Sequence, residues 1–116
     1  MPAKLLHAEE VPAKPVEIEG AKNVSVRWLI SKDDQAPTFA MRQFLLGAGG
    51  HTPRHSHDWE HEVYILEGSG RLHIGNSARA VSPGMVAFIP GGEVHQFVAD
   101  EEGDLSFLCL IPNSGK

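Results

Sequence analysis

The chain has little that would support a disulfide framework, nucleic-acid binding or a membrane span. Its 116 residues include one cysteine, Cys109, so no intramolecular disulfide can form. The chain has ten basic and 15 acidic residues, which gives a net charge of −5. The basic residues form no cluster, and this argues against a nucleic-acid partner. No stretch approaches the roughly 20 apolar residues of a membrane-spanning helix. The sequence therefore predicts a small-molecule partner, and neither nucleic acid nor a membrane.

The N-terminal segment carries acidic residues and prolines where a signal peptide needs a continuous apolar stretch. Together with the single cysteine, which suits a reducing compartment, this predicts a cytoplasmic protein. We expect residues 1–23 to form an extended arm, because proline disfavours a central strand. Such an arm could pair with an edge strand of a second copy, which predicts a homodimer; a frayed terminus is the alternative. Residues 24–113 would then form one domain and 114–116 a loose C-terminus.

Glycine and proline recur at short intervals along the chain and leave little room for helices. The segments between them are rich in Val, Ile, Leu and Phe, as strands are, and comprise residues 25–30, 39–46, 62–68, 71–75, 85–90, 95–99 and 105–112. Many short strands joined by turns predict an all-β sandwich, jelly roll or barrel.

Histidine is the residue type that stands out, with seven copies, several of them between His51 and His61. If residues 55–65 are extended, then His55, His57 and His61 lie on one face, since alternate side chains of a strand share a face. Two imidazoles at positions i and i+2 project together and suit metal chelation. The third histidine would complete a facial triad.

A fourth candidate ligand follows the predicted turn at Pro90, Gly91 and Gly92, where His95 begins the next apolar segment. A strand that returned beside the HxH pair would bring His95 to the triad. The four histidines are therefore candidate ligands of one divalent metal ion, although the sequence alone does not show that His95 lies beside the other three.

These two segments resemble the paired motifs of the cupin superfamily. The first motif reads G, five residues, HxH, three or four residues, E, six residues, G, and its start is matched by Gly49, His55 and His57. The second reads G, five residues, PxG, two residues, H, three residues, N, and is matched by Gly84, Pro90, Gly92 and His95, with Ala99 in place of the asparagine. The resemblance covers about residues 39–111 and implies a cupin-type double-stranded β-helix, a jelly-roll barrel.

The glutamate position of the first motif has two candidates. Glu62 is separated from Gly68 by five residues and lies on the opposite face of the predicted strand, whereas His61 fits both spacings of the motif. We therefore expect His61 to be a ligand and Glu62 to face away. The set of four histidines resembles that of the small four-histidine monocupins of bacteria. This resemblance alone implies manganese as the metal. Imidazole also suits Fe²⁺, Cu²⁺, Ni²⁺ and Zn²⁺.

The cavity beside the metal has further candidates. The resemblance implies that Phe107, Cys109 and Ile111 line it, although Cys109 could instead be an inert buried thiol. Arg42 is a charged residue in an apolar strand, and it either reaches solvent or faces the pocket and binds an anionic group; we favour the pocket. Trp59 is a candidate for the entrance wall or for ordinary packing.

Four imidazoles on a six-coordinate ion leave two positions open, which suits a substrate and O2 bound side by side. Because the ligands are neutral, the centre keeps its charge and attracts anionic or enolate oxygen. We expect a metal-dependent dioxygenase or related oxidoreductase acting on a small organic substrate with O2. One alternative is an isomerase or lyase acting on a sugar or keto acid, for which Glu60 and Glu62 are the candidate bases. The other is a non-catalytic binding cupin.

Overall fold

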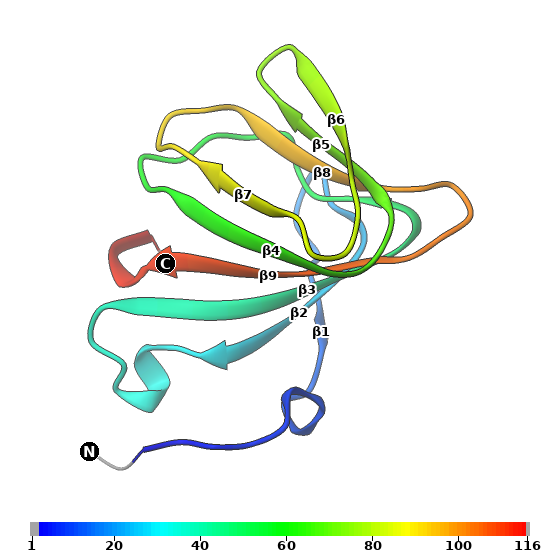
Figure 1. Cartoon of the computed structure of the whole chain (residues 1–116). Coiled ribbons are helices and arrows are strands. Elements are labelled where there is room, and N and C mark those ends of the chain that lie inside the picture. The colour runs from blue at the N-terminus through cyan, green and yellow to red at the C-terminus, as the bar shows by residue number, and fades with distance from the viewer. Residues whose placement is uncertain (1–2, 116) are drawn as a thin grey trace.

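The structure is a computed structural model that describes residues 3–115, and it is built mainly of antiparallel strands (Figure 1). The strands are β1 (Lys14–Pro15), β2 (Lys22–Ile30), β3 (Phe39–His51), β4 (His61–Gly68), β5 (Gly70–Ile74), β6 (Ser77–Val81), β7 (Val86–Ile89), β8 (His95–Ala99) and β9 (Leu105–Pro112). Three short 3-10 turns complete the elements, η1 (Ala8–Glu10), η2 (Lys32–Asp34) and η3 (Asn113–Gly115).

All seven predicted strand segments form strands, and the described residues contain no helix longer than a 3-10 turn. The prediction missed β6, because its side chains are exposed up to the last one, Val81, and show no apolar alternation. It also missed the two-residue β1.

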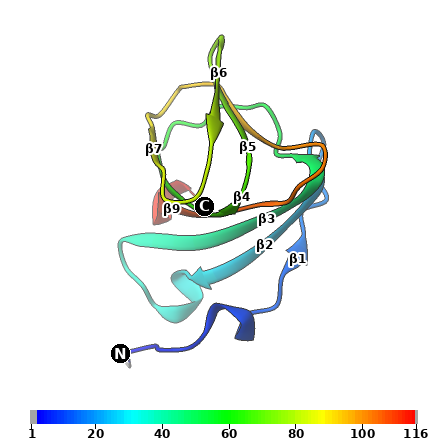
Figure 2. The ribbon, with the colours of Figure 1, turned by 45° about the vertical axis from the view of Figure 1, so that its right-hand side comes forward.

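The strands form a single curled sheet in the order β6-β5-β8-β3-β9-β4-β7, with β2 added to β3 and β1 added to β2. Figure 2 shows the curl, with β6 and β7 at its two ends. This arrangement confirms the predicted all-β class and agrees with a jelly-roll barrel.

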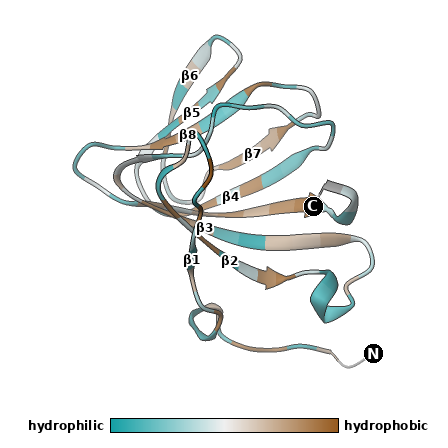
Figure 3. Ribbon diagram, turned by 180° about the vertical axis from the view of Figure 1, so that it is seen from behind, coloured by the Kyte–Doolittle hydropathy of each residue, from teal (hydrophilic) through white to brown (hydrophobic). Residues whose placement is uncertain are grey.

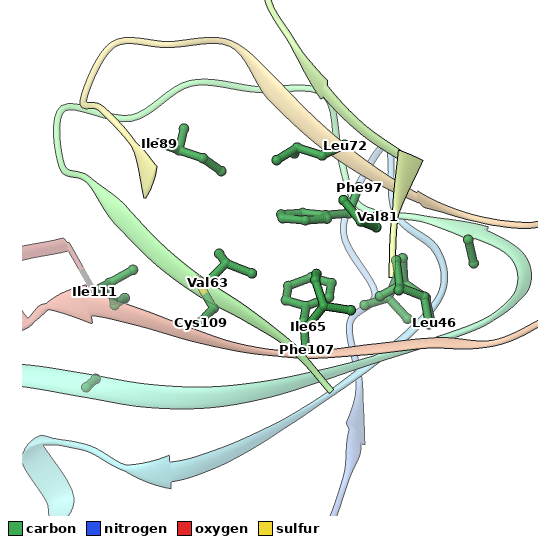
Figure 4. Close-up of a cluster of buried hydrophobic side chains, with 14 residues drawn as sticks. Leu46, Val63, Ile65, Leu72, Val81, Ile89, Phe97, Phe107, Cys109 and Ile111 are labelled. Carbon is green, nitrogen blue, oxygen red and sulfur yellow. The ribbon is translucent and has the colours of Figure 1, made fainter. Parts of the chain in front are cut away.

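Alternate side chains of these strands fill the interior of the curl. Figure 4 shows residues from β3 to β9 pointing into one apolar cluster, in which Phe107, Leu46 and Ile65 are among the largest fully buried side chains. The rings of Phe97 and Phe107 stack at 4.2 Å between centroids. Hydrophobic residues lie mainly along the strands, whereas η2 is hydrophilic (Figure 3).

The N-terminal arm lies along its own sheet. Strand β1 pairs with β2 of the same chain, with Lys14 opposite Val26, and Lys4 Nζ lies 2.9 Å from Asp34 Oδ1. Exchange of this arm with a second copy therefore stays a prediction. Residues 1, 2 and 116, at the ends of the predicted arm and C-terminus, lie outside the described residues. No helix within residues 3–115 is long and apolar enough to cross a membrane.

Candidate metal centre

The histidines of the site come from three parts of the chain. His55 and His57 lie in the β3–β4 connection, His61 begins β4 and His95 begins β8. The strand expected over residues 55–65 begins only at His61.

The reason for this difference is a tertiary contact. His55 forms an isolated antiparallel bridge with His95, and each backbone N–H of the pair donates to the carbonyl of the other. The chain then bends at Asp58, whose carbonyl lies against Gly91. The backbone of the HxH segment is therefore held by the His95 segment and not by a continuous strand.

The bridge gathers three imidazoles. One ring nitrogen from each of His55, His57 and His95 lies within 4.8 Å of the others. The ring centroids are 4.2 Å apart for His55 and His57 and 5.0 Å apart for His55 and His95. Three convergent imidazoles are an arrangement that holds a divalent transition metal.

His61 lies next to this cluster, but its ring nitrogens are not within 4.8 Å of those of all three other histidines. Its ring centroid is 4.7 Å from that of His95 and 5.4 Å from that of His57, and the side chain is buried. Its Nδ1 lies 3.3 Å from Cys109 Sγ, while its Nε2 is buried and has no hydrogen-bond partner among the described residues. A buried ring nitrogen without a partner beside three imidazoles fits a metal ligand. The role of His61 as the fourth ligand stays a prediction.

The protonation of the ring nitrogens favours metal binding. His95 Nδ1 lies 2.9 Å from the carbonyl oxygen of Glu93, an acceptor that places the proton on Nδ1 and leaves the lone pair of Nε2 free. Burial, with a smaller contribution from neighbouring charges, lowers the pKa of His55 to about 4 and that of His61 to about 3. Both imidazoles are therefore neutral near pH 7, which is the form that binds a metal.

An apolar cavity of about 370 Å³ adjoins the four histidines. Arg42, Phe107 and Cys109 line it, as does Trp59, whose ring stacks on His57 at 4.3 Å between centroids. Ile111 is buried on the same face of β9 but lines a separate surface groove. The reason is the strand register, which places Ile111 beyond Cys109 along β9 and opposite Ala40.

Arg42 reaches the cavity because the β3–β9 register sets it opposite Cys109. Its Nη2 donates to Cys109 Sγ at 3.1 Å. The guanidinium carbon lies 4.8 Å from the ring centroid of Phe44 and 5.3 Å from that of Trp28. Burial raises the pKa of the Cys109 thiol, and the Arg42 charge opposes this rise.

Sequence reasoning missed Phe44 and Trp28 as lining residues. The signal for Phe44 was its spacing of two from Arg42, which puts both side chains on one face of the strand. Trp28 became a neighbour only through its pairing with Arg42 in the β2–β3 register.

The acidic residues of the segment lie elsewhere. Glu62 is exposed, and both Glu60 and Glu62 line the surface groove that also contains Ile111. Within the described residues, the cavity beside the histidines has no carboxylate in its lining. Neither glutamate is placed to act as a base there.

Similarities to known proteins bear on this site. A family model described as "Cupin domain" matches residues 42–111. The polyketide cyclase RemF from Streptomyces resistomycificus is 39% identical, with a TM-score of 0.91 over 96% of this chain and 80% of that one. A cupin 2 conserved barrel domain protein from Rhodopseudomonas palustris is 28% identical, with a TM-score of 0.84 over 91% of this chain and 74% of that one.

The 1-methylthio-D-xylulose 5-phosphate methylsulfurylase of Rhodospirillum rubrum is 39% identical over 74 residues. This match covers 64% of the chain and 47%, about half, of the methylsulfurylase. The family model alone spans more than half of the chain and includes Arg42, Cys109 and all four histidine positions. The fold, the three clustered histidines and these likenesses agree with the resemblance inferred from the motifs, and they support a divalent metal site. The chain belongs to the cupin domain family.

Proposed function

We propose that this cupin is a metal-dependent oxidoreductase of the dioxygenase type, acting on a small organic substrate with O2. One divalent ion would be held by His55, His57, His61 and His95. The observation that carries the proposal is the Nε2 of His61, which is buried at the wall of an apolar cavity beside the other three imidazoles and has no hydrogen-bond partner within residues 3–115. The resemblance to four-histidine monocupins favours manganese, with iron, copper, nickel and zinc as alternatives.

An ion held by these histidines would supply Lewis acidity and would coordinate oxygen ligands. The residues around the site line the cavity and orient the histidine ligands. Phe97 and Phe107 form part of the apolar wall of the cavity. The stacking of Trp59 on His57 holds that imidazole in one orientation, and the Glu93 carbonyl does so for His95.

A non-oxidative reaction, with the metal only as a Lewis acid, is the second candidate. The likeness to a polyketide cyclase over 96% of this chain favours it. An isomerase or lyase would need a base in the cavity, and its described lining contains no carboxylate. The oxidative reaction is therefore the first candidate.

Oxygen uptake distinguishes the two candidates. The protein would be purified without a histidine tag, its metal identified by elemental analysis and EPR, and turnover of enols, catechols and alkenes followed in air and under argon. Consumption of O2 in step with substrate loss is the expected result. Turnover that proceeds equally under argon would support the Lewis-acid reaction and contradict the dioxygenase.

We also propose that the protein is a cytoplasmic homodimer. Tyr64, Val86 and Phe88 are exposed on β4 and β7, and such apolar surface suits contact with a second copy. Sedimentation analysis would test the dimer, and a monomer at micromolar concentration would contradict it.

A further inference from the structure

Arg42 brings a charge into an otherwise apolar cavity. The lining includes no other arginine or lysine within the described residues, and no carboxylate either. Within residues 3–115, one ion pair joins Lys4 to Asp34 and another joins His7 to Glu9. Neither ion pair includes Arg42, so no carboxylate among these residues neutralises its charge. A partly buried cation without a counter-ion is unfavourable unless a ligand supplies the opposite charge.

The side chain of Cys109 lies between the guanidinium group of Arg42 and the imidazole of His61. Cys109 Sγ accepts from Arg42 Nη2 at 3.1 Å and lies 3.3 Å from His61 Nδ1. With a divalent ion in the site, two positive groups would border the same apolar space, one on each side of Cys109.

Arg42 also has a donor that no described residue accepts. Its Nε is buried and has no hydrogen-bond partner among the described residues. The plane of the group is held by the rings of Phe44 and Trp28. A guanidinium fixed in this way, with unused N–H groups, matches the planar oxygens of a carboxylate or enolate.

The cavity constrains the rest of such a ligand. Its volume of about 370 Å³ lies at the lower end of the range of ligand pockets, roughly 300–1,000 Å³. Aromatic rings make up much of its wall, namely Trp28, Phe44, Trp59, Phe97 and Phe107. Flat apolar walls favour a flat ligand.

We infer that the substrate is a planar, unsaturated organic anion. Arg42 binds its carboxylate or enolate oxygen, and a second oxygen of the same molecule turns toward the histidine site. This assignment rests on the proposed metal site and names the class of substrate for it. Arg42 is thereby a specificity-determining residue, because a neutral analogue leaves its charge uncompensated.

Two aromatic probes of nearly equal shape test the charge requirement. Salicylate carries a carboxylate beside a phenol oxygen, and salicylamide carries a neutral amide in the same place. Binding of both to the metal-loaded protein would be measured by calorimetry, for the wild type and for Arg42→Met, Arg42→Lys and Arg71→Met. Arg71 is exposed on β5 and outside the cavity, so its variant removes the same charge elsewhere.

We expect Arg42→Met to weaken salicylate binding about 10-fold to 100-fold and to leave salicylamide binding nearly unchanged, since charge-assisted hydrogen bonds are the strong ones. Arg42→Lys should retain part of the preference, and Arg71→Met all of it. Thermal denaturation and elemental analysis would confirm that each variant is folded and metal-loaded.

Failure of the inference and failure of the proposed function would give different results. Equal losses for both probes, no loss with Arg42→Met, or no salicylate binding at millimolar concentration would each overturn the inference while the metal site stands. A wild-type protein that takes up no divalent metal would overturn the proposed function, and the inference with it.

Discussion

His61 Nδ1 lies 3.3 Å from Cys109 Sγ, and the same sulfur accepts a hydrogen bond from Arg42. A metal on Nε2 of His61 requires the ring proton on Nδ1, so that this N–H donates to the sulfur. Cys109 would then orient both a ligand and the cavity cation. The thiol links the proposed metal site to the proposed anion site.

Replacement of His61 tests the fourth ligand. In His61→Ala we expect metal affinity to fall at least about 10-fold, because loss of a ligand should cost no less than loss of a residue that orients one. Glu62→Ala is the matched control, since this neighbour is exposed and lines a different groove. Metal content after dialysis would be measured for both. Metal lost from the Glu62 variant and retained by the His61 variant would reverse the assignment.

Replacement of Cys109 tests the orienting role of the sulfur. Cys109→Ala removes the acceptor for both His61 and Arg42, and we expect metal affinity to fall by roughly 10-fold. Cys109→Ser keeps a hydrogen-bond acceptor on a shorter side chain, so this variant should lose less metal affinity. Competition with a chelator would give the affinities. Equal affinities for all three proteins would show that Cys109 is only a packing residue.

Gly91 offers a test of the loop that carries His57. A Cβ at position 91 would collide with the carbonyl of Asp58, so Gly91→Ala should displace this loop and weaken metal binding. Gly92→Ala is the control: its φ is +86°, but nothing lies within 4 Å of the added Cβ. It should cost about 1 kcal/mol of stability through backbone strain and leave metal affinity nearly intact. Denaturant unfolding and metal titration separate the two effects, and equal metal affinities in both variants would contradict the prediction.

Metal removal should lower the thermal stability. A ligand that binds only the folded chain adds about 2.7 kcal/mol at a free concentration about 100 times its Kd. We therefore expect the Tm to rise on addition of the native divalent metal and to fall with a chelator. In a variant lacking both His55 and His95, the same additions should leave the Tm unchanged, and a similar rise there would indicate a second site.

Several features followed from the sequence because they depend on local pattern. Alternation over β4 put His61, Val63 and Ile65 on the buried face and Glu62 on the exposed one. The absence of such alternation in β6 is why that strand escaped prediction. The cupin motifs identified the family and His55, His57 and His95, whereas His61 was identified by strand parity and motif spacing.

Other features depended on contacts between distant segments. The last strand is apolar on both faces, so its pattern did not show that Phe107 and Cys109 reach the cavity while Ile111 does not. The register of β9 against β3 decided this, and the same register placed Arg42 opposite Cys109.

The sequence by itself determined the all-β class, most of the strands and the four histidines as candidates, since periodicity and motif spacing are properties of short segments. The tertiary structure decided that His55 bridges His95, that the chain between His57 and His61 is a loop, and that Arg42 faces the histidines. These depend on strand register and loop packing, which arise from residues far apart in the chain and leave no local pattern.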